Sequence, residues 1–251
     1  SHWSYPEFLA ADFLIARRLS TRQIEDLIFA PEFSAGEQRQ IVPQLAETAA
    51  WLAMMDSEFR VSVIRHDPKT LLRSQVVSAD DESRRQIVDS LLQFAQDGRF
   101  SGSRIPPQDY RNLENSALTN QLIPWIGDHS KTVEVRRVAL NIVEGTASRC
   151  CEEAVRKLLY DTTDDIHLRC EALDAWLQLV DDYRHDDLIP LLQHLESDEY
   201  DELRGALLKV LWPSRLSAEE MFKYVAIPKR ENFIGAYAIF LWKTIPEKLT
   251  P

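Results

Sequence analysis

The stretch Val135-Arg136-Arg137-Val138-Ala139-Leu140 decides the fold, because the chain repeats its pattern twice. Leu168-Arg169-Cys170-Glu171-Ala172-Leu173 aligns with it, and so does Leu203-Arg204-Gly205-Ala206-Leu207-Leu208. The second residue of every copy is an arginine, and these arginines are 33 and then 35 residues apart. A period in this range is typical of stacked helix pairs, because one pair cannot bury its apolar face alone.

The residues around each copy extend the pattern. Acidic turns precede the copies, and a segment with helical spacing follows each of them, at residues 153–160, 188–195 and 218–225. This arrangement resembles the HEAT repeat over roughly residues 116–245. The resemblance implies an all-α fold, a right-handed α-solenoid of HEAT-like helix pairs. We predict that Arg136, Arg169 and Arg204 form a structural ladder to the acidic turns of successive repeats; a ligand-facing row is the alternative.

The first hundred residues are helical without this period. Apolar residues recur there at helical spacing, for example over residues 8–19, 24–28 and 45–55. The stretch from Gly98 to Gln108 is the least regular of the chain, and we interpret it as a loop between two halves. The predicted domains are therefore 1–100, a less regular helical part, and 101–251, the repeat array.

Composition limits the partners. The chain has 251 residues and a formal net charge of −11, and between Asp161 and Glu202 it has 14 carboxylates against two basic residues. A nucleic-acid partner is therefore not expected. We interpret the acidic run as solvated turns and outer helix faces, with an acidic docking surface as the alternative. No apolar run reaches membrane-spanning length. Three cysteines without a C-x-x-C spacing favour reduced thiols and a cytoplasmic location.

Common catalytic and nucleotide-binding motifs are missing from the sequence. It has no phosphate loop, no G-x-S-x-G and no H-E-x-x-H. Two His-Asp dipeptides, at His66 and His185, fall at predicted helix ends without a further histidine at ligand spacing. We therefore predict no catalytic residues, no metal site and no cofactor in this chain. Core packing is the predicted role of four tryptophans, Trp51, Trp125, Trp176 and Trp242.

The segment from His2 to Ala11 reads H-x-x-x-x-E-F-L-A-A. It resembles a segment of NACHT-type STAND NTPases that lies at the end of their winged-helix region. The stretch from Arg65 to Ser74 is similar to the helices that follow the NTPase in bacterial members. This resemblance implies that residues 1–100 are a coupling region and that residues 101–251 are a sensor array. It also implies that His2 contacts the ATP or ADP of the full-length parent protein.

Three functions follow as hypotheses. The first is a non-catalytic sensor or regulatory domain of such an NTPase, in bacterial antiviral defence or signalling, which recognises a protein or peptide ligand and contacts the parent NTPase module. The second is a stand-alone HEAT-like adaptor between proteins. The third is a HEAT-like DNA-repair or lyase enzyme, which the net charge of −11 disfavours.

Overall fold

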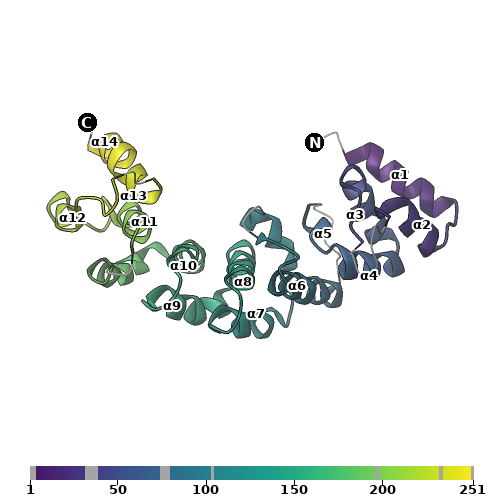
Figure 1. Ribbon diagram of the computed structural model, residues 1–251, viewed down its shortest axis with the longest axis horizontal. Helices are drawn as coiled ribbons and strands as arrows, with labels where there is room; N and C mark the ends of the chain where they lie inside the picture. The colour runs from purple at the N-terminus through teal and green to yellow at the C-terminus, as the bar shows by residue number, and fades with distance from the viewer. Residues whose placement is uncertain are drawn as a thin grey trace. The chain divides into compact units, whose positions relative to one another are not determined.

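The computed structural model describes residues 4–31, 39–73, 80–102, 105–195, 198–231 and 234–249. Within these ranges the chain is all-α, which confirms the all-α part of the predicted fold class (Figure 1). The described residues form no strand, and Phe29 and Ile41 make an isolated antiparallel bridge. No described helix combines the length and hydropathy that crossing a bilayer requires.

Two compact units divide the chain, Ser1–Gln121 and Leu122–Pro251. The sequence placed the boundary at residues 100 and 101, whereas residues 101–121 belong with the N-terminal unit. Polar contacts explain this assignment. The hydroxyl of Ser116 donates to Asp81 at 2.6 Å, and the amide of Gln121 donates to Asp89 at 2.6 Å.

The N-terminal unit consists of short helices that are held by small and aromatic residues. These are α1 (Ser4–Ala16), α2 (Thr21–Ile28), η1 (Pro43–Leu45), α3 (Ala46–Met55), α4 (Ser57–His66), α5 (Thr70–Arg73), α6 (Asp81–Gln96) and η3 (Pro107–Leu113). The central helix is α3, which packs against α1 and α4 through buried alanines such as Ala49 and Ala53. Phe8 of α1 meets Trp51 of α3 edge to face, with ring centroids 5.2 Å apart.

Helix α7 (Leu118–Ile126) begins in the N-terminal unit and ends in the C-terminal one. The C-terminal unit continues with α8 (Val133–Thr146), η4 (Arg149–Cys151), α9 (Glu152–Tyr160), α10 (Ile166–Leu179), η5 (Asp182–Gln193), α11 (Glu202–Leu211), α12 (Ala218–Tyr224), α13 (Ala236–Ile239), η6 (Phe240–Thr244) and α14 (Ile245–Leu249). The last three run on directly, with η6 as a π-helical turn, and are called the C-terminal helix below.

In the C-terminal unit, the helices that contain the three repeat copies lie next to one another. Helix α10 packs against α8 on one side and α11 on the other, and α11 also packs against the C-terminal helix (Figure 1). The predicted partner segments are helical as well, but the first two pack mainly on the copy that follows them rather than on the copy that precedes them: α9 packs on α10, and η5, which contains Pro190, packs on α11. The core is the row of buried leucines and alanines between these helices, such as Leu173 and Leu207.

Local signals decide where several helices begin and end. Ser217 caps α12 in a capping box with Glu220. Helix α11 ends at Leu211, just before the Trp212-Pro213 pair, because proline cannot continue a helix. Gly98 has a φ of +71° immediately after the end of α6, in the left-handed region that glycine adopts at little steric cost.

One tryptophan prediction is wrong. Trp176 is buried and Trp51 and Trp125 are half-buried, but the side chain of Trp242 is 76% exposed. The helical stripe of the sequence was real, because Trp242 and Ile239 share one face of the C-terminal helix. However, that helix packs on α11 through its other face, which carries Tyr237 and Phe240.

Candidate functional site

The buried arginines of the repeat copies tie neighbouring helices together. The Arg136 Nε of α8 donates to the carbonyl of Ile126 at 3.0 Å. Its two terminal nitrogens donate to the two carboxylate oxygens of Asp164, in the turn that precedes α10. Both side chains are almost fully buried, at 4% and 3% exposure. A bidentate pair of this kind fixes the distance and the orientation between the two helices.

Arg169 occupies the same place in the second copy. Its Nε donates to the carbonyl of Leu159 at 3.0 Å, again ten residues back along the chain, as for Arg136 and Ile126. The side chain is fully buried. Burial lowers the pKa of its guanidinium, and the nearby carboxylate of Asp198 partly opposes this effect. Arg136 and Arg169 are therefore equivalent both in their place in the sequence repeat and in the backbone carbonyl to which each donates.

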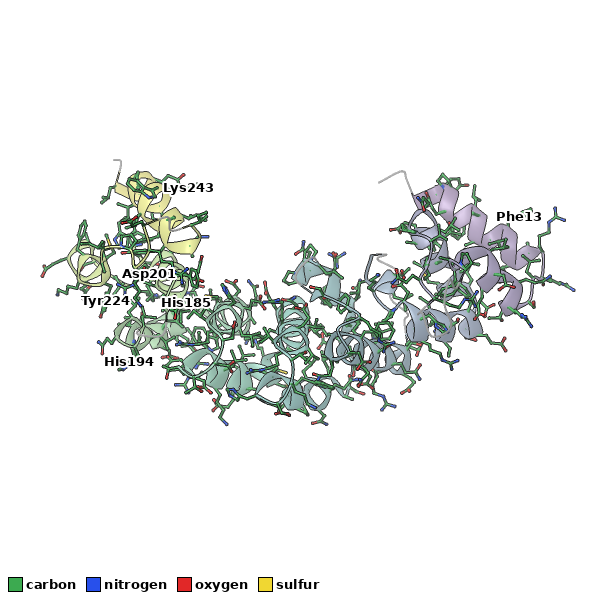
Figure 2. All side chains as sticks on the ribbon, viewed as in Figure 1. Phe13, His185, His194, Asp201, Tyr224 and Lys243 are labelled. Atoms are coloured by element: carbon green, nitrogen blue, oxygen red, sulfur yellow. The ribbon has the colours of Figure 1, made fainter. Side chains whose placement is uncertain are left out.

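Arg204 departs from the other two. It forms an ion pair at 3.1 Å with Asp201 of its own turn, and it donates to the carbonyl of Tyr224 in α12 at 3.1 Å. Figure 2 labels Asp201 and Tyr224, which come from the turn before α11 and from the end of α12. The predicted link to a following acidic turn is thus present at Arg136, whereas Arg204 contacts its own turn and the carbonyl of Tyr224 in α12.

Lys229, which the sequence pattern did not single out, is hydrogen-bonded to residues that precede α11. Lys229 Nζ donates to the carbonyls of Leu195 and Asp198, at 3.0 and 2.7 Å. Its backbone N–H donates to Asp201 at 2.9 Å. Lys229 lies in a segment without helical periodicity and about thirty residues from its acceptors, so no local signal could have identified it.

Helices α8 and α10 carry three carboxyls with raised pKa values, Glu144, Glu171 and Asp174, which we call the acidic face. Burial raises the pKa of Glu144 to about 7, and repulsion from the other two adds to the shift. Burial also raises the pKa of Glu171, although the Arg137 guanidinium lies 2.7 Å away. Desolvation raises the pKa of Asp174, which Lys209 opposes. Among the described residues, only Glu171 of the three forms an ion pair.

The acidic face can therefore attract a cationic group. A carboxylate that is partly desolvated and close to other carboxylates is stabilised when a positive charge approaches it, because the attraction of that charge offsets the repulsion between the carboxylates. A lysine or arginine side chain of a peptide meets this requirement. Two of its residues, Glu171 and Asp174, belong to the acidic run between Asp161 and Glu202, whereas Glu144 lies before that run.

Glu144→Gln tests the electrostatics of this face. The folded state holds the Glu144 proton more tightly than the unfolded chain does, so this group favours folding most below its ordinary pKa of 4.5. That contribution disappears as the pH rises through about 7. In urea unfolding, the variant should exceed the parent by about 1 kcal/mol at pH 8, after allowance for solvent screening, and should match it at pH 4.

Glu219→Gln is the matched control, because the Glu219 side chain is 89% exposed. Its effect on unfolding should be the same at both pH values. An equal stability of Glu144→Gln and the parent at pH 8 contradicts the raised pKa.

One group of side chains has the geometry to approach a metal ion. His129 Nε2 lies 3.2 Å from an oxygen of Asp161 and 3.7 Å from one of Asp164. However, both oxygens of Asp164 already accept hydrogen bonds from Arg136, whose positive charge opposes a cation. Thr163 hydrogen-bonds Asp161 through its hydroxyl and its backbone N–H, and these bonds lower the pKa of that carboxyl. The group is better explained as part of the arginine link than as a metal site.

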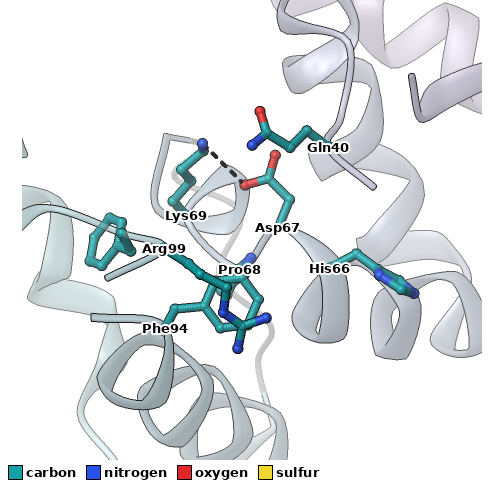
Figure 3. A pocket seen from close by; sticks show the side chains of 8 residues that line it. Gln40, His66, Asp67, Pro68, Lys69, Phe94 and Arg99 are labelled. Carbon is teal, nitrogen blue, oxygen red and sulfur yellow. Dashed lines mark ion pairs between the residues drawn. The ribbon is translucent and has the colours of Figure 1, made fainter. Parts of the chain in front are cut away.

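The first His-Asp dipeptide lines a small pocket of the N-terminal unit (Figure 3). Asp67 accepts a hydrogen bond from the backbone N–H of Ile41 at 3.2 Å and lies 3.7 Å from Lys69 Nζ. The His66 ring instead packs edge-on against Phe29, with centroids 5.7 Å apart. The two side chains therefore do not converge on one point, and the pocket has room for roughly one water molecule.

The remaining predicted residues add no chemistry. His2 lies outside the described residues. Cys150, Cys151 and Cys170 are free thiols, and burial together with nearby carboxylates raises the pKa of Cys170, which makes it a weak nucleophile.

Comparison of the chain with protein-family models, with curated proteins and with solved structures gives no match. Its function is therefore argued from the sequence and from the geometry above.

Proposed function

We propose that this chain is the non-catalytic sensor or regulatory part of a NACHT-type STAND NTPase. Its helix pairs form a right-handed HEAT-like solenoid, and its partners are a protein or peptide ligand and the parent NTPase module. The setting is antiviral defence or signalling in the bacterial cytoplasm. The link to the NTPase is supported by the segment from His2 to Ala11 and by the helical stretch that begins at Arg65.

One observation carries the repeat part of this proposal. Arg136 and Arg169 are buried in equivalent places, and each donates through Nε to the backbone carbonyl ten residues before it. Equivalent contacts at a period of 33 residues are what a stack of helix pairs requires, because each pair completes its core against the next. Such stacks present long surfaces that are used for binding.

The acidic face supports a ligand with a basic segment. Glu144 and Asp174 lie on adjacent helices of the stack and form no ion pair with a described residue. A lysine or arginine of the ligand would supply the missing positive charge, and such complementarity gives specificity and a fast encounter.

The switch itself follows from differential binding. A ligand that contacts two neighbouring helix pairs favours the arrangement in which both contacts are made, and it shifts the population by its difference in affinity for the two arrangements. A ligand that binds both arrangements equally has no regulatory effect, however tightly it binds.

The coding sequence that precedes Ser1 tests this proposal directly. We expect a phosphate loop, G-x-x-x-x-G-K-[ST], within the few hundred codons upstream. If that region encodes no phosphate loop, the NTPase assignment fails, and the adaptor function becomes the better account of the same helix pairs.

Isolation of the native protein from cells distinguishes the sensor from the adaptor. A sensor should acquire its ligand only under the inducing condition, such as infection, and the Glu144→Gln and Asp174→Asn double variant should capture less of it. A constant, stoichiometric partner under all conditions favours the adaptor. Glu219→Gln controls for the loss of an exposed carboxylate elsewhere.

A further inference from the structure

The C-terminal helix has two opposite apolar faces, and only one of them is packed within the described structure. Tyr237, Phe240 and Thr244 are buried on the side of α11. Ile239, Trp242 and Leu249 are 49%, 76% and 53% exposed, and we call these three residues the Trp242 face. Ile239 and Trp242 are three residues apart, which brings them toward the same side of the helix, and Leu249 follows after the π-helical turn, so the exposed apolar residues succeed one another along the helix.

The position of this stripe suits another helix. Helix α10 has α8 and α11 as neighbours, and α11 has α10 and the C-terminal helix. The C-terminal helix contacts α11, and no other described helix packs against it to a comparable extent. Helix α11 covers the face that carries Tyr237 and Phe240. The Trp242 face is a second apolar surface on the opposite side of the same helix.

The charge beside the stripe differs in sign from that of the chain. The C-terminal helix carries Lys243, Lys248 and a single carboxylate, Glu247, whereas the whole chain has a net charge of −11. Lys248 is used within the unit, because its Nζ donates to the carbonyl of Trp212 at 2.7 Å. Lys243, next to Trp242, forms no ion pair with a described residue (Figure 2).

From these observations we infer that the Trp242 face docks an amphipathic helix of a partner protein whose apolar stripe is flanked by acidic residues. The leucine-type residues of that helix cover Trp242 and Ile239, and its carboxylates lie near Lys243. An exposed tryptophan in the centre of an apolar stripe is the residue type that most often dominates the binding energy of an interface.

A second copy of the chain fits this face less well. A two-fold dimer through the same stripe would bring together two helices that each have a net charge of about +1, and like charges oppose association. A lipid surface fits less well too, because binding to anionic membranes relies on clusters of cationic residues, and this helix has a net charge of only about +1.

Selection from a peptide library tests the inference. The library displays helical peptides of about 18 residues with leucine at helical spacing and with glutamate, lysine or serine at the flanking positions. Selection on the full 251-residue chain should enrich glutamate at the flanks. An enriched peptide should bind Trp242→Ala roughly tenfold or more weakly than the parent.

Lys243→Glu is the decisive variant, because it should reverse the selected flanks from glutamate to lysine. Tyr183→Ala is the matched control, since Tyr183 is a 69% exposed aromatic residue elsewhere in the same unit, and this variant should bind like the parent. Circular dichroism of each variant checks that the helices are intact.

Several outcomes overturn the inference. One is the absence of enrichment, and another is peptide binding that Trp242→Ala leaves unchanged. Concentration-dependent dimers that Trp242→Ala abolishes assign the face to a second copy. Sedimentation with vesicles of phosphatidylserine and phosphatidylcholine, if Trp242→Ala abolishes it, assigns the face to a lipid surface.

Discussion

Replacement of Arg136 by alanine should lower the free energy of unfolding by about 3–5 kcal/mol. The substitution leaves Asp164 buried, at 3% exposure, without the guanidinium that now satisfies both of its oxygens. It also removes the donor to the carbonyl of Ile126. Urea unfolding followed by circular dichroism measures the change as a lower midpoint for the transition of the C-terminal unit.

A double variant tests whether this loss comes mainly from the buried, unpaired charge of Asp164. Arg136→Met with Asp164→Leu removes both charges together, so it should recover much of the stability that Arg136→Ala loses. Lys157→Ala is the control, because its ion pair with Glu153 is exposed, and it should change the stability by about 0.5 kcal/mol or less. A loss under 1 kcal/mol for Arg136→Ala contradicts the buried link.

Replacement of Gly205 by alanine should destabilise the packing of α11 on the C-terminal helix. A Cβ at this position would lie 2.1 Å from the backbone nitrogen of Tyr237 and 2.3 Å from the carbonyl carbon of Ala236. Since backbone atoms cannot rotate away as a side chain can, the helices have to separate. The hydrogen bond from the Ala236 N–H to Glu202, now 2.8 Å long, is strained by the same movement.

The expected loss is about 2 kcal/mol, since overpacking costs roughly 1–3 kcal/mol or more and alanine recovers about 1 kcal/mol of helix propensity. Amide hydrogen exchange should become faster along the C-terminal helix. Gly127→Ala is the control, because no atom lies within 4 Å of the added Cβ. If Gly205→Ala is as stable as the parent, the close approach of these helices is incorrect.

The acidic face was predicted from the sequence only in part. The sequence identified the acidic run and offered a docking surface as one of two interpretations. It did not single out Glu144, which lies before that run and whose pKa is raised by burial and then by repulsion from Asp174 and Glu171 on the next helix. The shift arises from burial and from distances between helices, and neither can be read from spacing along one helix.

The helix boundary at Asp67 illustrates the same limit. Asp67 followed by Pro68 has the pattern of an N-cap before a helix. Instead, Asp67 ends α4, and its carboxylate accepts the backbone N–H of Ile41, 26 residues away. A backbone donor 26 residues away cannot be identified from the local sequence, so only the folded chain shows that this carboxylate accepts the N–H of Ile41.

By itself, the sequence determined that the chain is helical, that α12 begins at the Ser217 cap, and that Arg136 and Arg169 occupy equivalent places. These properties depend on neighbours within a few turns, which the order of residues specifies. The tertiary structure decided which carboxylate each arginine meets, which residues join the N-terminal unit, and that Trp242 faces outward. A helical stripe shows that two faces differ, but the side on which a neighbouring helix packs depends on residues far away in the chain.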